Sequence, residues 1–518
     1  MANITATTIP LGSKPYASPF YSLGIEVCQN LYLEVAQSEN SKAQYYLLKI
    51  PGMRKFGTTD AINKGACRGL YTSAAGATYG VFGNKFYEID MNGSKTELGT
   101  LITSTEQVQM AENGKQLMLV DGSAGYIFDY TTITFTQIRD EYFPGNAEGT
   151  LAPTHVAYND TRFIINVPNT NEYYYSNPYY AYNADNTSKD YDPAVIDGYW
   201  NPIQSGRKFA QADNIVGLCC AQNYVWLFGL NTCEVAYDTG NYNGQLYARY
   251  DGAIMQIGCS SPRSIVNIAN NVYWLGSDRT GIVGVFTNNG MQPQRISKRG
   301  LEQIIEEMDT YSDAIGYAYS QAGHTFYVLQ FPKGGRTFVY DTVTDSWHER
   351  TYLNQATGLV EAHKALYATH NFDKLIVGHS THSTVFEFDP TYYLNDNPDN
   401  ELTNYIKCIK TSPISFNNGT LVRYNAVQPI FQQGVGLAKD TVYDNAMEPK
   451  CWIAWSDDSG ESWSSETDAP MGRMGEYFKR SRVFTSGIGR NRVWRISVTA
   501  PVQVILIGII VESLPCRF

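Results

Sequence analysis

Residues 223–239 read NYVWLFGLNTCEVAYDT and contain the pattern that decides the fold. An apolar segment ends at Gly229, a turn containing Asn231 follows, and a second segment closes on Asp238. Aromatic and β-branched residues bounded by Gly, Asn and Asp predict two short strands joined by a tight turn. We expect the closing aspartate to accept a backbone N–H in the turn behind it.

The closing phrase recurs along the chain. It appears as NKFYEID (Asn84 to Asp90), AGYIFDY (Ala124 to Tyr130), RTFVYDT (Arg336 to Thr342) and STVFEFDP (Ser383 to Pro390). The closing aspartates are 39 residues apart between Asp90 and Asp129, and 48 apart between Asp341 and Asp389. A repeat of about 40 to 50 residues with four short strands is typical of a β-propeller blade. The sequence therefore predicts an all-β fold with a propeller of six or seven blades over residues 66–398.

Three segments depart from this repeat. Near residues 168–206 lies a Tyr- and Asn-rich insertion, NEYYYSNPYYAYNADN, which we interpret either as a tolerated surface loop or as a contact surface. Residues 399–518 alternate strand and turn signals, which predicts a C-terminal β-sandwich-like domain. Residues 1–65 contain the strand-like segments LYLEV and YYLLKI. We expect this N-terminal piece to close the propeller ring or to join the C-terminal piece in a β-rich platform built from both chain ends.

Composition excludes several classes of protein. Hydrophobic residues make up 43% and charged residues only 17%, which excludes intrinsic disorder and a coiled coil. The net charge of −11 argues against a primary nucleic-acid binder, although an acidic wall suits DNA that must slide past without sticking. The longest apolar run, Val502 to Val511, is too short for a membrane span, and the N-terminus is not a signal peptide. We expect no membrane insertion and a chain made in a cytoplasm, with its nine scattered cysteines reduced.

The segment SDDSGESW, residues 456–463, fits the pattern S-x-D-x-G-x-x-W. It resembles the Asp box of sialidases, a hairpin turn in which Asp458 accepts backbone hydrogen bonds. Ser456 begins the box, Gly460 supplies the positive-φ position and Trp463 packs under the turn. Sialidases repeat this box and need three arginines to bind a carboxylate, whereas this chain holds one copy. We therefore interpret the box as structural.

Two clusters of ionisable residues invite a metal-site interpretation. Five of the seven histidines lie between His348 and His382, and His379 and His382 are three residues apart. Residues three apart on a strand face opposite sides, so we expect exposed turn histidines rather than zinc ligands. The helix-like segment Arg299 to Tyr311, capped by Ser297, carries Glu302, Glu306 and Glu307 on what we expect to be a solvent-facing side. We expect no catalytic residue, metal or cofactor, and hence no enzyme.

The most strongly polarised segment is basic. It runs from Arg473 to Arg495 and includes Lys479, Arg480, Arg482, Arg490, Arg492 and Arg495. One interpretation is a solvated strand edge that its charge keeps from aggregating. The other is a docking patch for an acidic partner subunit or a local phosphate contact.

Several segments together resemble the packaged-DNA stabilisation proteins of short-tailed bacteriophages, the tail hub or nozzle of podoviruses. The segments are CQNLYLE (Cys28 to Glu34), LLKIPGMRKFG (Leu47 to Gly57), DNIVGLCCAQNYVWLFGLNTCEVAYDTGN (Asp213 to Asn241), ISKRGLEQIIEEM (Ile296 to Met308) and GIGRNRVWRISVTAPVQVILIGIIVE (Gly487 to Glu512). They follow the family order, and none is catalytic. This chain departs from the family in its Tyr/Asn-rich insertion and its longer C-terminal region.

The resemblance implies a structural virion protein: a homo-hexameric ring around the DNA channel, below the portal and adaptor. Such a ring would retain packaged double-stranded DNA without sequence preference until ejection, and would carry tail fibres, spikes or a needle. It would assemble in the host cytoplasm and end in the virion tail. The alternative from another class is a carbohydrate-binding or carbohydrate-cleaving propeller of the virion, which needs an acidic or arginine-bearing pocket at the propeller axis. A third hypothesis is a monomeric cellular scaffold.

Overall fold

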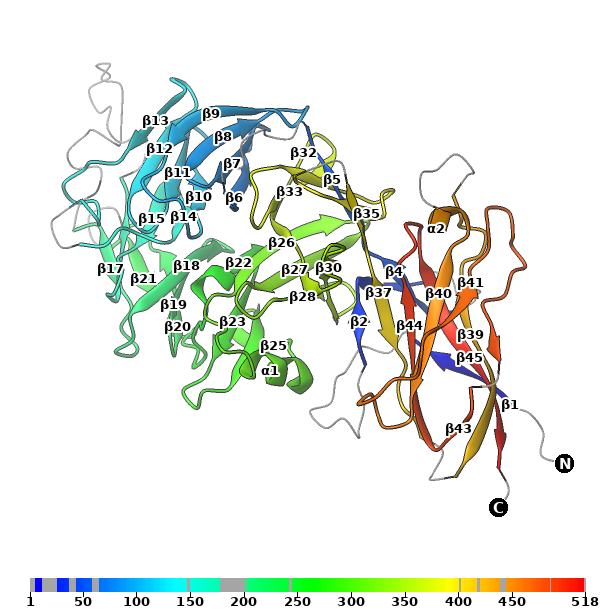
Figure 1. Ribbon diagram of the computed structural model, residues 1–518. Helices are drawn as coiled ribbons and strands as arrows, with labels where there is room; N and C mark the ends of the chain where they lie inside the picture. The colour runs from blue at the N-terminus through cyan, green and yellow to red at the C-terminus, as the bar shows by residue number, and fades with distance from the viewer. Residues whose placement is uncertain are drawn as a thin grey trace.

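The computed structural model describes residues 5–11, 26–36, 43–57, 65–146, 150–177, 200, 203–241, 245–399, 402–416, 420–437, 444–484 and 486–516. Figure 1 shows two parts side by side: a ring of small sheets on the left and a sandwich of longer strands on the right. Both chain ends lie at the sandwich. The fold is all-β, as the alternation of the sequence predicts.

In the described part of the chain, seven four-stranded units, the blades of the propeller, form the ring. Blades 1 to 3 are β6 (Cys67–Thr72), β7 (Thr78–Phe82), β8 (Lys85–Ile89), β9 (Lys95–Thr100); β10 (Gln109–Glu112), β11 (Gln116–Val120), β12 (Gly125–Asp129), β13 (Thr134–Gln137); and β14 (Val156–Asn159), β15 (Arg162–Asn166), β16 (Glu172–Tyr175), β17 (Ser205–Arg207). Blades 4 and 5 are β18 (Ile215–Ala221), β19 (Tyr224–Gly229), β20 (Cys233–Asp238), β21 (Tyr247–Arg249); and β22 (Val266–Ile268), β23 (Asn271–Ser277), β24 (Val283–Asn289), β25 (Gln292–Arg295).

The last two blades depend on the N-terminal segment. Blade 6 is β26 (Ile315–Gln321), β27 (His324–Phe331), β28 (Arg336–Asp341) and β29 (Ser346–Glu349), and blade 7 is β32 (Ala365–Asn371), β33 (Lys374–His379), β34 (Phe386–Asp389) and β5 (Gly52–Lys55). β5 is the outermost strand of blade 7 and pairs antiparallel with β34, from Gly52 opposite Asp389 to Lys55 opposite Phe386. The ring therefore closes with a strand that precedes blade 1 in the sequence.

Blade 6 continues into the sandwich. β2 (Cys28–Gln29) pairs with β29 on one side and with β37 (Cys408–Thr411) on the other, so one ten-stranded sheet runs through both parts. Its remaining strands are β44 (Asn491–Val498), β40 (Lys450–Ser456), β41 (Thr467–Pro470) and β38 (Ser415–Phe416). The N-terminal residues thus both close the ring and join the C-terminal piece.

The second sheet of the sandwich also combines both chain ends. It contains β3 (Leu31–Val35), β4 (Tyr45–Lys49), β45 (Ile505–Pro515), β39 (Val422–Phe431), β42 (Val483–Phe484), β43 (Ile488–Gly489) and β1 (Thr5–Pro10). Between the two sheets lies one apolar core in which Leu31, Leu47 and Trp494 are fully buried. The smaller elements are β30 (Thr351–Leu353), β31 (Val360–Ala362), β35 (Leu394–Asp396), β36 (Thr403–Tyr405), η3 (Pro262–Ser264), α1 (Arg299–Glu306) and α2 (Asp444–Met447).

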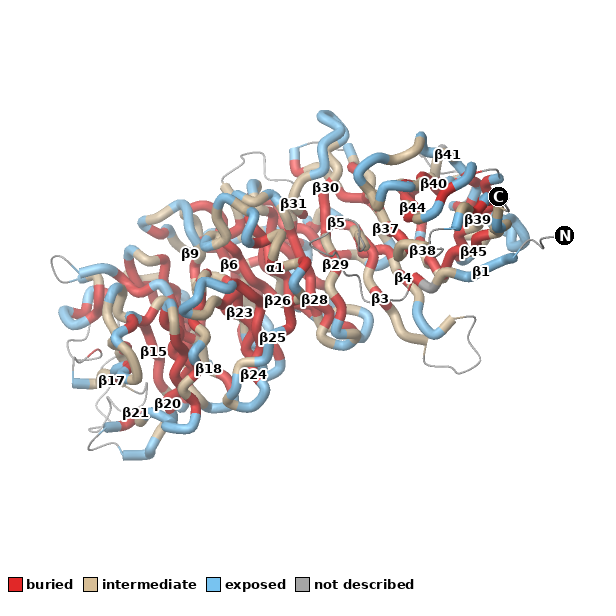
Figure 2. Tube along the Cα trace, turned by 90° about the horizontal axis from the view of Figure 1, so that it is seen from below, coloured by how far each residue is buried: buried red, intermediate tan, exposed pale blue. Residues whose placement is uncertain are grey.

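The propeller core lies between neighbouring blades. Each apolar cluster of the ring joins adjacent blades, for example Trp226 of blade 4 with Trp274 of blade 5. Figure 2 shows these buried strands as the interior of the ring, with the exposed residues on the connecting loops. Such burial is the dominant stabilising term of a propeller.

The closing aspartates behave as their position predicts. Asp90 Oδ1 accepts the backbone N–H groups of Asn92 and Ser94, and Asp129 Oδ1 accepts those of Thr131 and Thr132. Asp238, Asp341 and Asp389 each accept the N–H of the residue two positions on. These turns are local, so the sequence alone predicts them.

The Tyr/Asn-rich insertion lies in blade 3, between β16 and β17. Residues 178–199, 201 and 202 lie outside the described residues, so a contact role for them stays a prediction. Trp200 is fully buried, and its ring packs edge-on against Phe143 at 5.3 Å. The insertion is thus anchored to the core near its end.

Candidate functional site

A funnel-shaped cavity of about 820 Å³ lies among the loops that lead into the first strands of blades 2 to 6. Its ionisable lining residues are Glu106, Asp121, His155, Arg263, Asp313 and Lys333. Arg263 forms an ion pair with Glu106, and Thr103 donates a hydrogen bond of 2.6 Å to Asp121. The position and polarity suit a small polar ligand at the propeller axis.

His155 stays neutral at the wall of this funnel. Its Nε2 lies 3.2 Å from the carbonyl oxygen of Pro262, and burial lowers its pKa to about 4. A histidine that is neutral throughout the physiological range does not exchange protons there. The lining residues include one arginine, and that arginine is already paired with Glu106.

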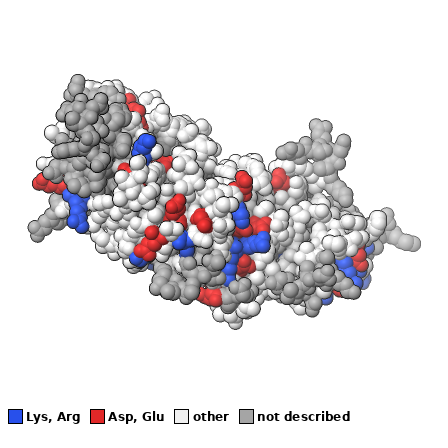
Figure 3. All heavy atoms as spheres, turned by 90° about the horizontal axis from the view of Figure 1, so that it is seen from above, with Lys and Arg blue, Asp and Glu red and all other residues white. Residues whose placement is uncertain are grey.

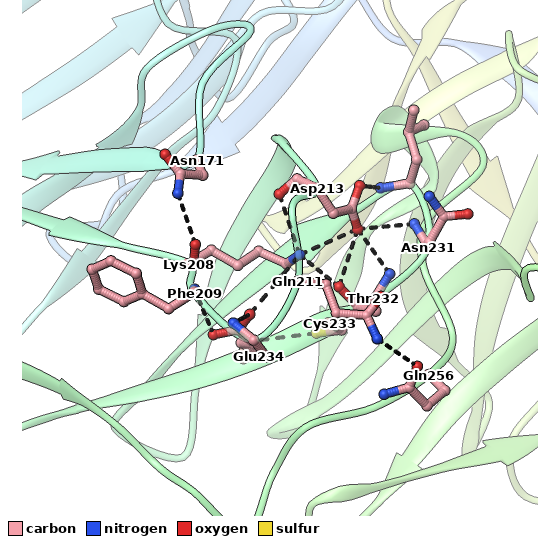
Figure 4. Close-up of polar contacts among 12 residues, drawn as sticks. Asn171, Lys208, Phe209, Gln211, Asp213, Asn231, Thr232, Cys233, Glu234 and Gln256 are labelled. Carbon is pink, nitrogen blue, oxygen red and sulfur yellow. Dashed lines mark hydrogen bonds and ion pairs between the residues drawn. The ribbon is translucent and has the colours of Figure 1, made fainter.

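A buried ion cluster joins blades 3 and 4 (Figure 4). The Lys208 side chain is fully buried, and its Nζ lies 3.2 Å from Asp213 Oδ2, 2.6 Å from Thr232 Oγ1 and 4.0 Å from Glu234 Oε1. Glu234 in turn accepts the backbone N–H groups of Phe209 and Ala210. Every charge is paired and hydrogen-bonded, which is the condition for burying it.

Asp213 organises the turn between β19 and β20. Its carboxylate accepts the N–H groups of Leu230, Asn231 and Thr232, and also the Thr232 hydroxyl. Burial alone would raise its pKa, but these hydrogen bonds and Lys208 outweigh burial and lower it. Asp213 and residues 232–234 belong to the segment from Asp213 to Asn241 that resembles the phage family, and in the structure they stabilise this turn.

The Asp-box segment forms a tight turn after β40. Ser456 Oγ donates 2.6 Å to Asp458 Oδ1 and accepts the Gly460 N–H at 2.7 Å. Asp458 accepts the Ser462 N–H, and the hydrogen bonds from Ser456 and Ser462 lower its pKa. Gly460 has φ +103°, a region that other residues avoid. Trp463 is half-buried, and Arg495 stacks over its ring at 4.4 Å.

The basic patch divides into two groups. Arg492 is buried and forms a bidentate pair with Asp457, with both bonds 2.7 Å long. Arg482 pairs with Glu512, and Arg495 pairs with Glu466. The side chains of Lys479 and Arg480 are exposed and form no ion pair among the described residues. Arg490 is exposed.

The expectation of exposed turn histidines is wrong for three of the five. His348, His363 and His379 are buried, and burial lowers the pKa of His363 and of His379 to about 3. His379 and His382 do not face opposite sides, because β33 ends at His379 and a turn brings their rings to 4.9 Å. Within the described ranges, no three His, Cys, Asp or Glu side chains are grouped to bind a metal.

The expected solvent-facing glutamate row is also partly wrong. α1 ends at Glu306 rather than near Tyr311, and Lys298 rather than Ser297 occupies its N-cap. Glu302 is buried and accepts a hydrogen bond of 2.6 Å from Ser297 and another from Arg295. The expectation fails for Glu302 because β25 brings Arg295 against this side of the helix. Glu306 pairs with Arg299 on the exposed side.

The nine cysteines are free, and six of them are buried. Over the described part of the chain, no helix is long and apolar enough to cross a membrane. Figure 3 shows a face that is mostly uncharged, with acidic and basic side chains intermingled where they occur.

Two family descriptions match this chain in order. The first, "Bacteriophage P22 Gp10, beta-propeller", matches residues 22–393, and the second, "Bacteriophage P22 Gp10, beta-sandwich", matches residues 410–513. The chain belongs to the bacteriophage P22 Gp10 family. It is therefore a phage DNA-stabilisation protein with a structural role in the virion, and the predicted resemblance and fold class are confirmed.

Solved structures share only a distant likeness. A streptogramin B lyase is 10% identical with a TM-score of 0.39, covering 69% of this chain and 97% of its own. A virginiamycin B lyase from Staphylococcus aureus is 9% identical with a TM-score of 0.38, covering 64% and 96%. The Pan2 WD40 domain of Neurospora crassa is 8% identical with a TM-score of 0.37, covering 66% and 96%. None of the curated proteins matches this sequence.

Proposed function

We propose that this P22 Gp10 family member is a subunit of the phage tail nozzle. Six copies form a ring around the DNA channel below the portal and adaptor, retain packaged DNA until ejection, and carry fibres, spikes or a needle. The observation that carries this proposal is the ordered match of both family domains over nearly the whole chain. Assembly takes place in the host cytoplasm, and the mature ring belongs to the virion tail.

Several structural features support a mechanical role. The ten-stranded sheet makes propeller and sandwich one continuous β-structure, which suits a part that bears load. The whole net negative charge belongs to residues 1–398, because residues 399–518 hold nearly equal numbers of acidic and basic residues. An acidic ring favours release of DNA, since it does not attract the phosphate backbone.

Mass photometry of the purified chain, alone and with its portal–adaptor complex, tests this proposal. Six copies bound to each complex are the expected result. A chain that ignores the complex overturns the proposal.

The axial funnel keeps a second function open, because it has the acidic and arginine-bearing lining that a carbohydrate propeller requires. A glycan array checks this function. Binding by the wild type that is lost in Arg263→Ala would establish it, whereas an array without binding would remove it.

A further inference from the structure

An ordered loop of the sandwich presents apolar and basic side chains to solvent. This loop, the tip, comprises residues 474–480 between β41 and β42. Phe478 is 97% exposed, and Met474 and Tyr477 are exposed by 61% and 65%. Single exposed apolar side chains are common, but a group of them on one loop marks a contact surface.

Contacts with neighbouring residues hold the backbone of the tip in one conformation. Glu476 Oε2 accepts the Arg473 N–H at 3.0 Å, and the Gln433 side chain donates to the Lys479 carbonyl oxygen. The Tyr477 ring lies so close to Gly434 that a Cβ there would meet it at 2.7 Å. The backbone is thus fixed while Phe478, Lys479 and Arg480 point outward, which lowers the entropy cost of binding.

A pocket with complementary chemistry lies in blades 3 and 4. This tyrosine–aspartate pocket has a volume of about 670 Å³, and its walls include Asp160, Asp238, Tyr224, Tyr237 and Tyr250. The Tyr250 ring lies 6.1 Å from that of Tyr224 and 6.3 Å from that of Tyr237. Aromatic walls bind an aromatic side chain, and carboxylates bind a basic one.

The carboxylates of this pocket form no ion pair among the described residues, although Arg162 lies near Asp238. Asp238 Oδ1 accepts the Gly240 N–H at 2.7 Å, while its Oδ2 is buried with no hydrogen-bond partner among the described residues. Burial and the neighbouring Asp160 raise the pKa of Asp238, and they outweigh the Gly240 N–H and Arg162, which lower it. An incoming ammonium or guanidinium group would relieve this repulsion.

The tip and the pocket lie at opposite ends of the molecule. Figure 2 places β20 and β21 of blade 4 at one end and the sandwich strands at the other. Two different surfaces at opposite ends cannot meet within one chain, but they generate a head-to-tail contact between copies. The acidic propeller and the exposed Lys479 and Arg480 give the two surfaces opposite charge.

We propose that the tip of one copy docks into the tyrosine–aspartate pocket of the next copy. Phe478 enters between the tyrosine rings, and Lys479 and Arg480 pair with Asp160 and Asp238. This inference rests on the proposed ring and names the contact that would build it.

Charge reversal tests the contact in the full chain. Lys479→Glu with Arg480→Glu, and separately Asp160→Lys with Asp238→Lys, should each weaken association between copies at least about tenfold, since like charges then meet. Combining all four changes in one chain should restore ring formation, because the reversed surfaces again match. The control is Lys115→Glu with Arg279→Glu, an equal charge change at two exposed residues outside both surfaces, which should leave assembly unchanged.

A cross-link provides the independent measurement. Phe478→Cys with Asn223→Cys at the pocket rim should give a ladder of linked chains under a short bismaleimide, and each single variant should not. If six copies bind the portal–adaptor complex but no ladder forms, the proposed contact is wrong and the proposed ring remains supported. Linked chains that never close into six would instead overturn the ring while the contact stands.

Another occupant of the tip is detectable in the same set of variants. If the wild type binds vesicles containing phosphatidylserine, and the Lys479→Glu, Arg480→Glu chain loses that binding while rings form normally, the tip faces a membrane. That result also overturns the contact.

Discussion

His324 of the propeller and Glu34 of the sandwich form an ion pair, with 2.8 Å between Nε2 and Oε2. The other ring nitrogen lies 2.7 Å from Asp341 Oδ2. Glu34 belongs to β3 and Asp341 to β28, so one imidazole joins the two parts of the protein. Residues so far apart in the sequence gave no signal of this bridge.

The bridge predicts a pH-dependent stability. Burial alone lowers the pKa of His324, but the hydrogen bonds that its protonated ring donates to Asp341 and Glu34 outweigh burial and raise the pKa to about 9. The stabilisation is therefore complete below the unfolded value of about 6.5 and is lost as the pH rises through 9. The neighbouring His348 does not contribute to the loss above about pH 6.5, because burial lowers its pKa well below the usual value and it is neutral there in both the folded and the unfolded chain.

Thermal unfolding of the wild type and His324→Gln between pH 6 and 10 checks this prediction. The wild-type midpoint should fall over this window relative to the variant. The exposed His370→Gln should behave as the wild type. Parallel curves for the wild type and His324→Gln would contradict the bridge.

Lys208→Met should be strongly destabilising. It leaves Asp213 and Glu234 as buried carboxylates without their cation, which costs about 3–5 kcal/mol when one partner of a buried pair is removed. The neighbouring Arg207→Met is the matched control, since Arg207 pairs with Glu172 at the surface and should cost less than about 1 kcal/mol. Urea unfolding of the wild type, Lys208→Met and Arg207→Met measures the loss in the free energy of unfolding. Equal losses in the two variants would contradict a stabilising role for the buried ion cluster.

Arg492→Lys should destabilise the sandwich although the charge is kept. Lysine cannot form the bidentate pair with Asp457, nor stack on the Tyr424 ring, which lies 4.3 Å from the Arg492 guanidinium carbon. We expect a loss of about 2–3 kcal/mol, because hydrogen bonds to charged groups of this kind contribute that much. Arg480→Lys, at an exposed arginine, should leave the unfolding midpoint unchanged, and a similar loss there would contradict the division of the basic patch.

Gly52→Ala should loosen the closure of the ring. A Cβ at Gly52 would lie 2.0 Å from the Leu394 carbonyl oxygen, so β5 would have to move away from that segment. Overpacking of this kind costs about 1–3 kcal/mol. Hydrogen exchange should increase in β5 and β34, whereas Gly508→Ala, whose Cβ would meet its nearest atom at 3.6 Å, should not change it. Unchanged protection in Gly52→Ala would show that β5 does not depend on this close approach.

The local features of the propeller were predictable from the sequence. The turns at Asp90, Asp129 and Asp389 need only a carboxylate and the N–H two positions on, so the order of residues is sufficient. The same holds for the Asp-box turn, where Ser456, Asp458 and Gly460 bond to one another. Alternation and repeat length likewise indicated the strands and the blades.

The sequence by itself thus determined the strand type, the repeat and the short-range turns of this protein. Tertiary structure alone decided that β5 closes the ring, that β2 joins blade 6 to the sandwich, and which charges remain exposed. Glu302 and His363 are buried because other strands cover them. Arg492 is not available at the surface as a docking residue, because it is buried and paired with Asp457 in the folded sandwich. Such partners come from distant segments, and only the packing of the blades and sheets brings them within the few ångströms over which hydrogen bonds and ion pairs act.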